Sequence, residues 1–156
     1  MNDVPALLEK VSLLALEDWG LTLVERCDNA PEFDISRTKY ALVEYNGVAC
    51  GTIVVVCGFK LLETLWQNVL GVEDDTSCAL DSESYADAAK ELVNIICGNF
   101  LTEVYGEDTV FELSVPDVVS IDDDRLNKVL NSRLVLHFEA DGIPVTVALL
   151  RQEDAR

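Results

Sequence analysis

The feature that most constrains the fold is the segment of residues 82–105, whose apolar side chains recur every three or four positions. At roughly 100° per residue, this spacing gathers them on one side of a helix. The stripe comprises Tyr85, Ala89, Leu92, Val93, Ile96 and Phe100. Because such a stripe must be buried, the segment predicts one long amphipathic helix packed against a core.

The opposite side of this helix carries Asp87, Glu91, Asn94 and Gly98. Inside a helix, asparagine costs about 0.5 kcal/mol relative to alanine, and glycine costs about 1 kcal/mol. Local losses of this kind are expected at functional sites, and a glycine leaves room for a partner's backbone to approach. Two interpretations remain open: a functional surface, or an ordinary solvated face opposite a buried stripe.

The composition limits the possible partners. The chain has 156 residues, 49% of them hydrophobic, and a formal net charge of −18. This length fits a single domain, which we expect to span residues 1–156. Nucleic acid and anionic membranes repel so acidic a protein, and no apolar run approaches the roughly 20 residues of a membrane helix. The first residues lack the basic start of a secretion signal, which predicts a cytoplasmic protein.

Cysteine and histidine offer no evident metal site or catalytic triad. The cysteines are odd in number and none are spaced C-x-x-C, which argues against a disulfide scaffold and against zinc. The one histidine, His137, lies in an apolar run and fits a strand better than a set of ligands. We expect the acidic runs 73–75 and 122–124 to be solvated loops, with calcium binding as a weaker alternative, since neither run has calcium-loop spacing. We therefore expect no metal and no cofactor bound by this chain itself.

Two hairpins and several helices account for the rest of the chain. An Asn-Gly or Asp-Gly pair between two β-rich runs predicts a tight turn, since both turn positions need φ > 0. Such pairs are Asn46-Gly47 and Asp141-Gly142. The expected order is helix 3–18 closed by a left-handed Gly20, strand 21–25, hairpin 40–57, helix 60–70, helix 82–105, strand 109–115, helix 124–130 and hairpin 133–150. Helices and hairpins grouped in this way predict an α+β domain, in which helices pack on an antiparallel sheet.

The order of helix, hairpin, helix and hairpin indicates a diverged internal duplication. If the two helices correspond, Glu9 and Ser12 of the first take the places of Glu91 and Asn94 of the second. The first copy then keeps the glutamate but lacks the asparagine. This difference favours one functional site over two.

Several of these residues resemble the CheX/CheC/FliY family of chemotaxis phosphatases, most closely its CheX branch. The pattern Asp87-x-x-x-Glu91-x-x-Asn94-x-x-x-Gly98 resembles the signature of that family. The likeness continues in residues 69–71 (VLG), 113–118 (LSVPDV) and 138–142 (FEADG), and so spans most of the chain. The sequence departs from the family pattern at residues 100–101, which are bulky, and at residues 119–121, which lack a glycine.

The resemblance implies an aspartyl-phosphate phosphatase that acts on phosphorylated CheY-like receiver domains in two-component or chemotaxis signalling. Glu91 and Asn94 would be catalytic: Glu91 would pair with the receiver's lysine, and Asn94 would orient the attacking water. Asp87 and Gly98 would contact the receiver, which would itself bind Mg²⁺. The resemblance also implies a homodimer formed through sheet edges. The alternative is a module of the same fold that binds a receiver, or dimerises, without catalysis.

Overall fold

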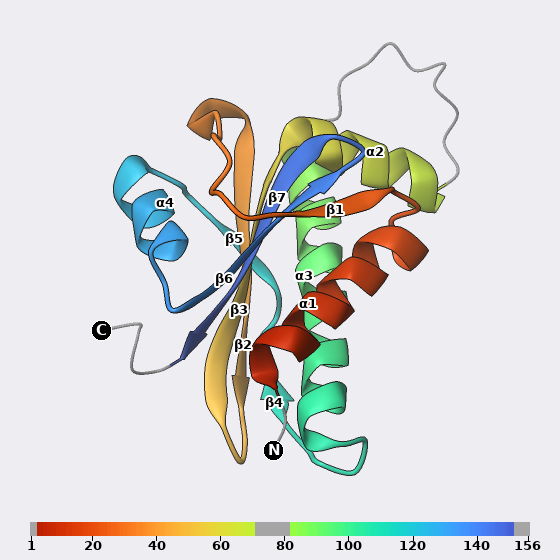
Figure 1. Ribbon diagram of the computed structural model, residues 1–156, viewed down its shortest axis with the longest axis vertical. Helices are drawn as coiled ribbons and strands as arrows, with labels where there is room; N and C mark the ends of the chain where they lie inside the picture. The colour runs from red at the N-terminus through yellow and green to blue at the C-terminus, as the bar shows by residue number, and fades with distance from the viewer. Residues whose placement is uncertain (1–2, 71–81, 152–156) are drawn as a thin grey trace.

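A computed structural model describes residues 3–70 and 82–151 of the chain (Figure 1). In these residues seven strands form one antiparallel sheet in the order β1-β6-β7-β3-β2-β4, and β5 also pairs with β2. The strands are β1 (Val24–Cys27), β2 (Thr38–Asn46), β3 (Cys50–Gly58), β4 (Glu112–Leu113), β5 (Asp117–Val119), β6 (Leu134–Ala140) and β7 (Ile143–Arg151). The centre of the sheet is therefore built from the two predicted hairpins, β2–β3 and β6–β7.

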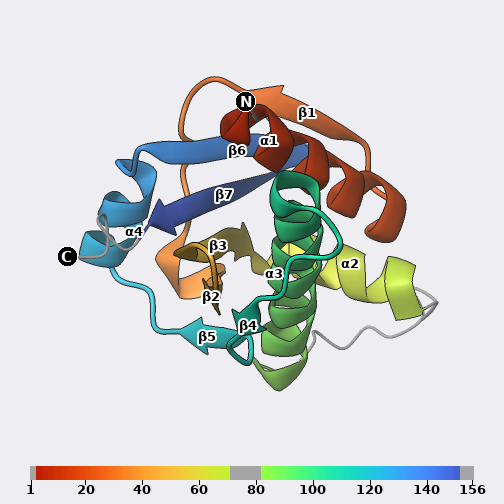
Figure 2. The ribbon, with the colours of Figure 1, turned by 90° about the horizontal axis from the view of Figure 1, so that it is seen from below.

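Helices cover both faces of this sheet (Figure 1, Figure 2). The α-helices are α1 (Val4–Leu14), which continues into a π-helical turn at Ala15–Trp19, α2 (Phe59–Leu70), α3 (Ser82–Tyr105) and α4 (Asp123–Leu130). α1, α2 and α3 lie together on one face, and α4 lies on the other. Asp3 caps α1 by accepting a hydrogen bond from the Ala6 N–H at 3.2 Å. Among the described residues, no helix combines the length and hydrophobicity that crossing a bilayer requires.

The alternation of side chains along the strands produces two cores. On β3, Val55 belongs to the core under α1, α2 and α3, whereas Val56 belongs to the core under α4. The long helix α3 has the bounds predicted from the sequence, and the six residues of its predicted apolar stripe are all buried in the larger core. The smaller core holds Leu126 and Val129 of α4.

The topology repeats about the contact between β3 and β7. The first half contributes α1, β1 and the hairpin β2–β3, and the second contributes α3, β4, β5 and the hairpin β6–β7. The short strands are exchanged, because β1 pairs with β6 while β4 and β5 pair with β2. This arrangement agrees with the predicted duplication, and the predicted α+β class is confirmed.

The second hairpin has the tight turn that its sequence predicts. Ala140 pairs with Ile143, which leaves Asp141 and Gly142 as the two turn residues. Their φ values are 50° and 78°, as a primed hairpin turn requires.

The first hairpin forms, but its predicted turn is wrong. Asn46 pairs with Cys50, so the loop contains three residues, and neither Asn46 nor Gly47 has a positive φ. Gly47 is needed for a different reason. A Cβ at this position would lie 2.8 Å from Phe111 Cδ1, closer than a side chain there could tolerate.

The first helix also ends differently from the prediction. Gly20 has a φ of −80°, and Leu21 takes the left-handed conformation instead, with a φ of 57°. A Cβ on Gly20 would lie 2.6 Å from Leu65 Cδ2, so this glycine permits close packing against α2. The strand predicted at 21–25 begins later, at Val24, because its position is set by pairing with β6.

The segment between α3 and α4 contains only two short strands. The strand predicted at 109–115 is reduced to β4, and Pro116 separates it from β5. Residues 122–124, predicted as a solvated loop, provide the cap and the first turn of α4, where the Asp122 carboxylate accepts the Arg125 N–H at 2.8 Å. The acidic run 73–75 lies outside the described residues.

Candidate functional site

Aromatic contacts anchor α3 on both halves of its length. The Tyr85 ring stacks on Phe59 of α2 with centroids 4.2 Å apart, and its hydroxyl donates to Glu63 Oε1 at 2.5 Å. Further along, the Phe100 ring lies 6.5 Å from the ring of Tyr45 on β2. These contacts fix the rotation of the helix about its axis, and so determine which side chains face solvent.

The side of α3 that faces solvent carries the four residues identified from the sequence. Asp87, Glu91 and Asn94 are exposed, and Gly98 is partly exposed. They follow one another at three- and four-residue intervals, which places them on successive turns of one face. The side chains of Asp87, Glu91 and Asn94 form no hydrogen bond or ion pair within the part of the chain that the structure describes. A carboxylate and a carboxamide one turn apart are thus available to a partner.

Gly98 leaves a bare stretch of backbone one turn beyond Asn94. A Cβ built on Gly98 meets no atom within 4 Å, so packing inside the protein does not require a glycine. Its φ is not positive, so the backbone conformation does not require one either. The helix-propensity cost of Gly98 therefore has no explanation among the described residues.

The corresponding positions of α1 do not form a second surface of this kind. Glu9 is paired with Arg26 of β1, with Oε1 and Nη1 3.2 Å apart. Ser12 is completely buried, and its hydroxyl has no hydrogen-bond partner among the described residues. The two corresponding helix positions therefore differ, since α3 presents an unengaged acid and amide and α1 does not.

Two thiols and the imidazole of His137 are buried in the core. Burial raises the pKa of the Cys57 and Cys97 thiols to about 12, so neither is a ready nucleophile. His137 is buried in β6, with its Nδ1 2.8 Å from Thr146 Oγ1 of β7. Burial and the nearby Arg26 lower the pKa of His137. In residues 3–70 and 82–151, no three His, Cys, Asp or Glu side chains are grouped so as to hold a metal ion.

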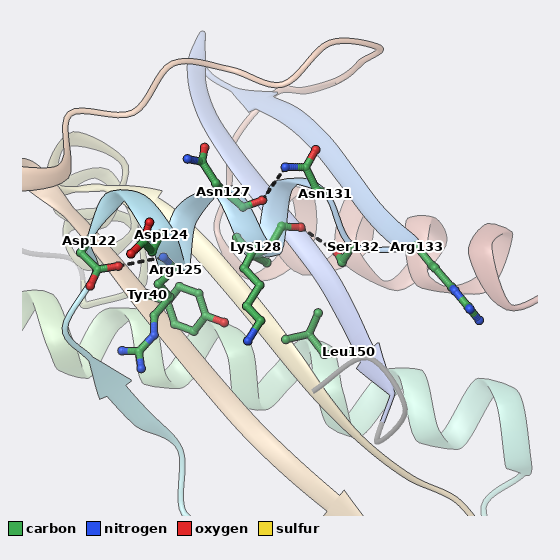
Figure 3. Close-up of a pocket in the computed structure, with 11 residues that line it drawn as sticks. Tyr40, Asp122, Asp124, Arg125, Asn127, Lys128, Asn131, Ser132, Arg133 and Leu150 are labelled. Carbon is green, nitrogen blue, oxygen red and sulfur yellow. Dashed lines mark hydrogen bonds between the residues drawn. The ribbon is translucent and has the colours of Figure 1, made fainter. Parts of the chain in front are cut away.

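A second polar surface, on the other face of the sheet, was not predicted from the sequence. A groove of about 860 Å³ lies beside α4 and is lined in part by Tyr40, Arg125, Lys128 and Leu150 (Figure 3). Its walls come from β2, α4 and β7, which are far apart in the chain. The one local signal was the three-residue interval that places Arg125 and Lys128 on the same side of a helix.

Comparison with known proteins identifies a family for this chain. Residues 39–139 match the family model described as "Chemotaxis phosphatase CheX". The matched range contains the whole of α3, and with it Asp87, Glu91, Asn94 and Gly98. No curated protein sequence matches this chain.

Solved structures share the same fold at low sequence identity. The chemotaxis protein CheX from Vibrio vulnificus is 16% identical, with a TM-score of 0.69 and 96% of each chain covered. CheX from Borrelia burgdorferi, solved in a complex with CheY, BeF3 and Mg²⁺, is 19% identical, with a TM-score of 0.70 over 95% of this chain and 97% of that one. FliY from Thermotoga maritima is 15% identical, with a TM-score of 0.60 over 97% and 87%. Because the family model matches most of the sequence, and these structures agree with it in fold, this chain belongs to the CheX family of chemotaxis phosphatases.

Proposed function

We propose that this chain removes the phosphoryl group from phosphorylated CheY-like receiver domains, and that Glu91 and Asn94 are its catalytic residues. The observation that carries the proposal is the pair itself, because both side chains lie one turn apart on the solvent face of α3 and have no partner among the described residues. Membership of a chemotaxis phosphatase family supports the reaction, and the complex of the Borrelia CheX with CheY supports the partner.

In this proposal Asn94 acts on water. Its amide carries both a donor and an acceptor, so it can hold a water molecule with the oxygen in line with the bond between phosphorus and the receiver's aspartyl oxygen. The water oxygen forms the new bond to phosphorus, the aspartyl oxygen leaves as a carboxylate, and the proton passes to the released phosphate or to solvent. Mg²⁺ bound by the receiver would neutralise the charge on the phosphoryl oxygens. In the proposed reaction, the contribution of Asn94 is therefore an amide that positions the attacking water.

Glu91 would fix the orientation of the complex. Its carboxylate lies one turn before Asn94 and would pair with the receiver's active-site lysine, an interaction that gains strength when docking excludes water. Asp87 would extend the contact by another turn, and the bare backbone at Gly98 would let the receiver's backbone come close to α3. We expect the protein in the cytoplasm, together with such receivers.

The test measures phosphate loss from a panel of phosphorylated receivers from the same genome, with and without this chain. We expect at least one receiver to lose phosphate faster in its presence. Asn94→Ala should lower the catalysed rate by about 10²-fold or more and leave receiver affinity nearly unchanged. Glu91→Ala should lower both rate and affinity, and added salt should reproduce part of that loss in the wild type.

Asn99 offers a matched control for Asn94. It is an exposed asparagine on the same helix, but at roughly 100° per residue it lies about 140° around the axis from Asn94. Asn99→Ala should keep the wild-type rate. Binding of a phosphorylated receiver without faster hydrolysis would make the chain a binding module, and full activity of Asn94→Ala would show that the water-orienting role is wrong.

We also propose that two copies associate through a sheet edge. Apolar side chains are exposed at this edge, with Leu113 of β4 43% accessible and Val115, in the link between β4 and β5, 84% accessible. An exposed apolar edge with unpaired backbone groups favours pairing with a second copy. Light scattering coupled to gel filtration should show the mass of a dimer, and Val115→Lys should shift the mass toward that of a monomer. A wild-type monomer at high concentration would contradict the proposal.

A further inference from the structure

The groove beside α4 contains a buried tyrosine whose polar end is not engaged. Tyr40 of β2 is only 6% exposed, and its hydroxyl points into the groove (Figure 3). This hydroxyl makes no hydrogen bond within the described ranges 3–70 and 82–151. Leu150 of β7 provides an apolar wall next to it. A hydroxyl fixed by a buried ring and left without a partner is ready to donate to a ligand.

Cations outnumber carboxylates around this groove, in a chain whose net charge is −18. Arg125, Lys128 and Arg133 line it, together with Asp122 and Asp124. Asp122 already accepts the N–H of Arg125 as the cap of α4, and in Figure 3 Asp124 lies at that end, away from the hydroxyl of Tyr40. The local charge is therefore opposite in sign to that of the whole chain.

The two arginines and the lysine have different surroundings. The guanidinium of Arg125 lies 5.7 Å from the centre of the Tyr40 ring and donates a hydrogen bond to the Ser120 carbonyl. Arg133 points away from Tyr40 (Figure 3). Lys128 extends from α4 toward the space beside Tyr40 and Leu150, and its ammonium forms no ion pair among the described residues. Lys128 is thus the cation best placed to meet a ligand in the groove.

We propose that this groove binds a small organic anion, whose phosphate or carboxylate lies between the Lys128 ammonium and the Tyr40 hydroxyl and whose apolar part rests on Leu150. Both polar groups donate hydrogen bonds, a lysine is an effective point charge for phosphate, and the neighbouring surface is apolar. Burial raises the pKa of Tyr40, which keeps its hydroxyl protonated as a donor at neutral pH. Because α4 and α3 lie on opposite faces of the sheet, this site is separate from the surface proposed to dock the receiver.

The probes are phenyl phosphate, phenylacetate and the uncharged benzyl alcohol, each titrated into the full chain and followed by ¹H–¹⁵N NMR. We expect saturable shifts for at least one of the two anions, confined to α4 and the adjoining parts of β2 and β7. Whichever anion binds more tightly identifies the acid group. Benzyl alcohol should bind more weakly than the better anion, because it supplies the ring without the charge.

Variants test the two named contacts. Lys128→Gln should weaken binding of the better anion about tenfold or more, and Tyr40→Phe, which keeps the buried ring, should weaken it about two- to tenfold. Lys60→Gln, at an exposed lysine of α2, is the control for the loss of one charge. All three should keep the wild-type melting temperature within a few degrees and the wild-type rate of receiver dephosphorylation.

Three results would each overturn the proposal. They are no saturable binding of either anion, benzyl alcohol binding as tightly as both anions, and equal affinity of the better anion for Lys128→Gln and Lys60→Gln. These three results come from titrations of small molecules without a receiver, so the test of the groove stands even if the proposed phosphatase activity is not found.

Discussion

The substitution Gly98→Ala should stabilise the protein and weaken its affinity for the phosphorylated receiver. Gly98 sits inside α3, and a Cβ built there meets nothing within 4 Å. Alanine should therefore add no clash, and it removes a helix-propensity cost of about 0.8–1 kcal/mol. For a chain of this length, a gain of that size corresponds to a rise in melting temperature of about 2–4 °C.

The expected loss appears only in the complex. If the receiver's backbone approaches α3 at Gly98, the added methyl group must overpack that contact, at a cost of roughly 1–3 kcal/mol. This corresponds to a weakening of receiver affinity of about fivefold to 150-fold. The same methyl group would thus raise the free energy of unfolding and lower the affinity for the phosphorylated receiver.

Two assays on each variant separate these effects. Chemical denaturation gives the free energy of unfolding, and fluorescence titration with a phosphorylated receiver gives the affinity. Asn99→Ala is the control, since it also improves helix propensity in α3 but points to a different side. Gly98→Ala that gains stability and binds as well as wild type would refute the close approach, and Gly98→Ala that loses stability would refute the open space seen around Gly98.

Three further predictions concern the fold itself. Ser12→Ala removes a buried hydroxyl without a partner among the described residues, so the free energy of unfolding in urea should rise by about 1 kcal/mol. A fall of more than about 1 kcal/mol in that free energy would argue that the hydroxyl is hydrogen-bonded. Leu21 has a left-handed φ of 57° and a side chain that is 62% exposed, so Leu21→Gly should relieve backbone strain. The melting temperature should rise by an amount equivalent to at most about 1 kcal/mol. A lower melting temperature would show that packing of the leucine side chain stabilises the protein. Because the pKa of His137 is lowered from its ordinary value of 6.5, the unfolded chain binds more protons than the folded chain as the pH falls. The free energy of unfolding should therefore fall as the pH drops from about 7.5 to about 5.5, and it should fall less in His137→Gln. Equal pH dependence of the two proteins in urea denaturation would contradict this.

Local patterns predicted structure well where a residue's own conformation decided the outcome. The long periodic stripe of α3 fixed its bounds, and the Asp141-Gly142 turn depends on the φ values of those two residues. The same reasoning failed at Asn46-Gly47, where the glycine is required by close packing against Phe111, a residue from a distant segment. Short edge strands were misplaced for a similar reason. Near β1, for example, Leu23 and Asp141 exchange two hydrogen bonds of 2.8 Å across the sheet, which no local pattern reveals.

The functional surfaces divide in the same way. The exposure of Glu91 and Asn94 follows from their helical phase opposite Leu92 and Ile96, and the structure confirms it. What these side chains do depends on atoms of a partner, and those lie outside any single-chain pattern. The groove beside α4 could not be predicted, because Tyr40 and Lys128 meet only once the sheet has formed and α4 has packed on it.

The exchanged short strands bear on how the chain folds. The hairpin β2–β3 of the first half gains its outer neighbours only from the second half, and β6 of the second half gains its outer neighbour only from the first. Neither half can complete its part of the sheet alone, because both edges are formed by pairing between residues far apart in the chain. Such long-range pairing slows folding. We expect folding and unfolding in one cooperative step, with no stable half-folded intermediate. The two halves, expressed as separate polypeptides, should be unfolded alone and should recover the native sheet when mixed, each completing the edge of the other.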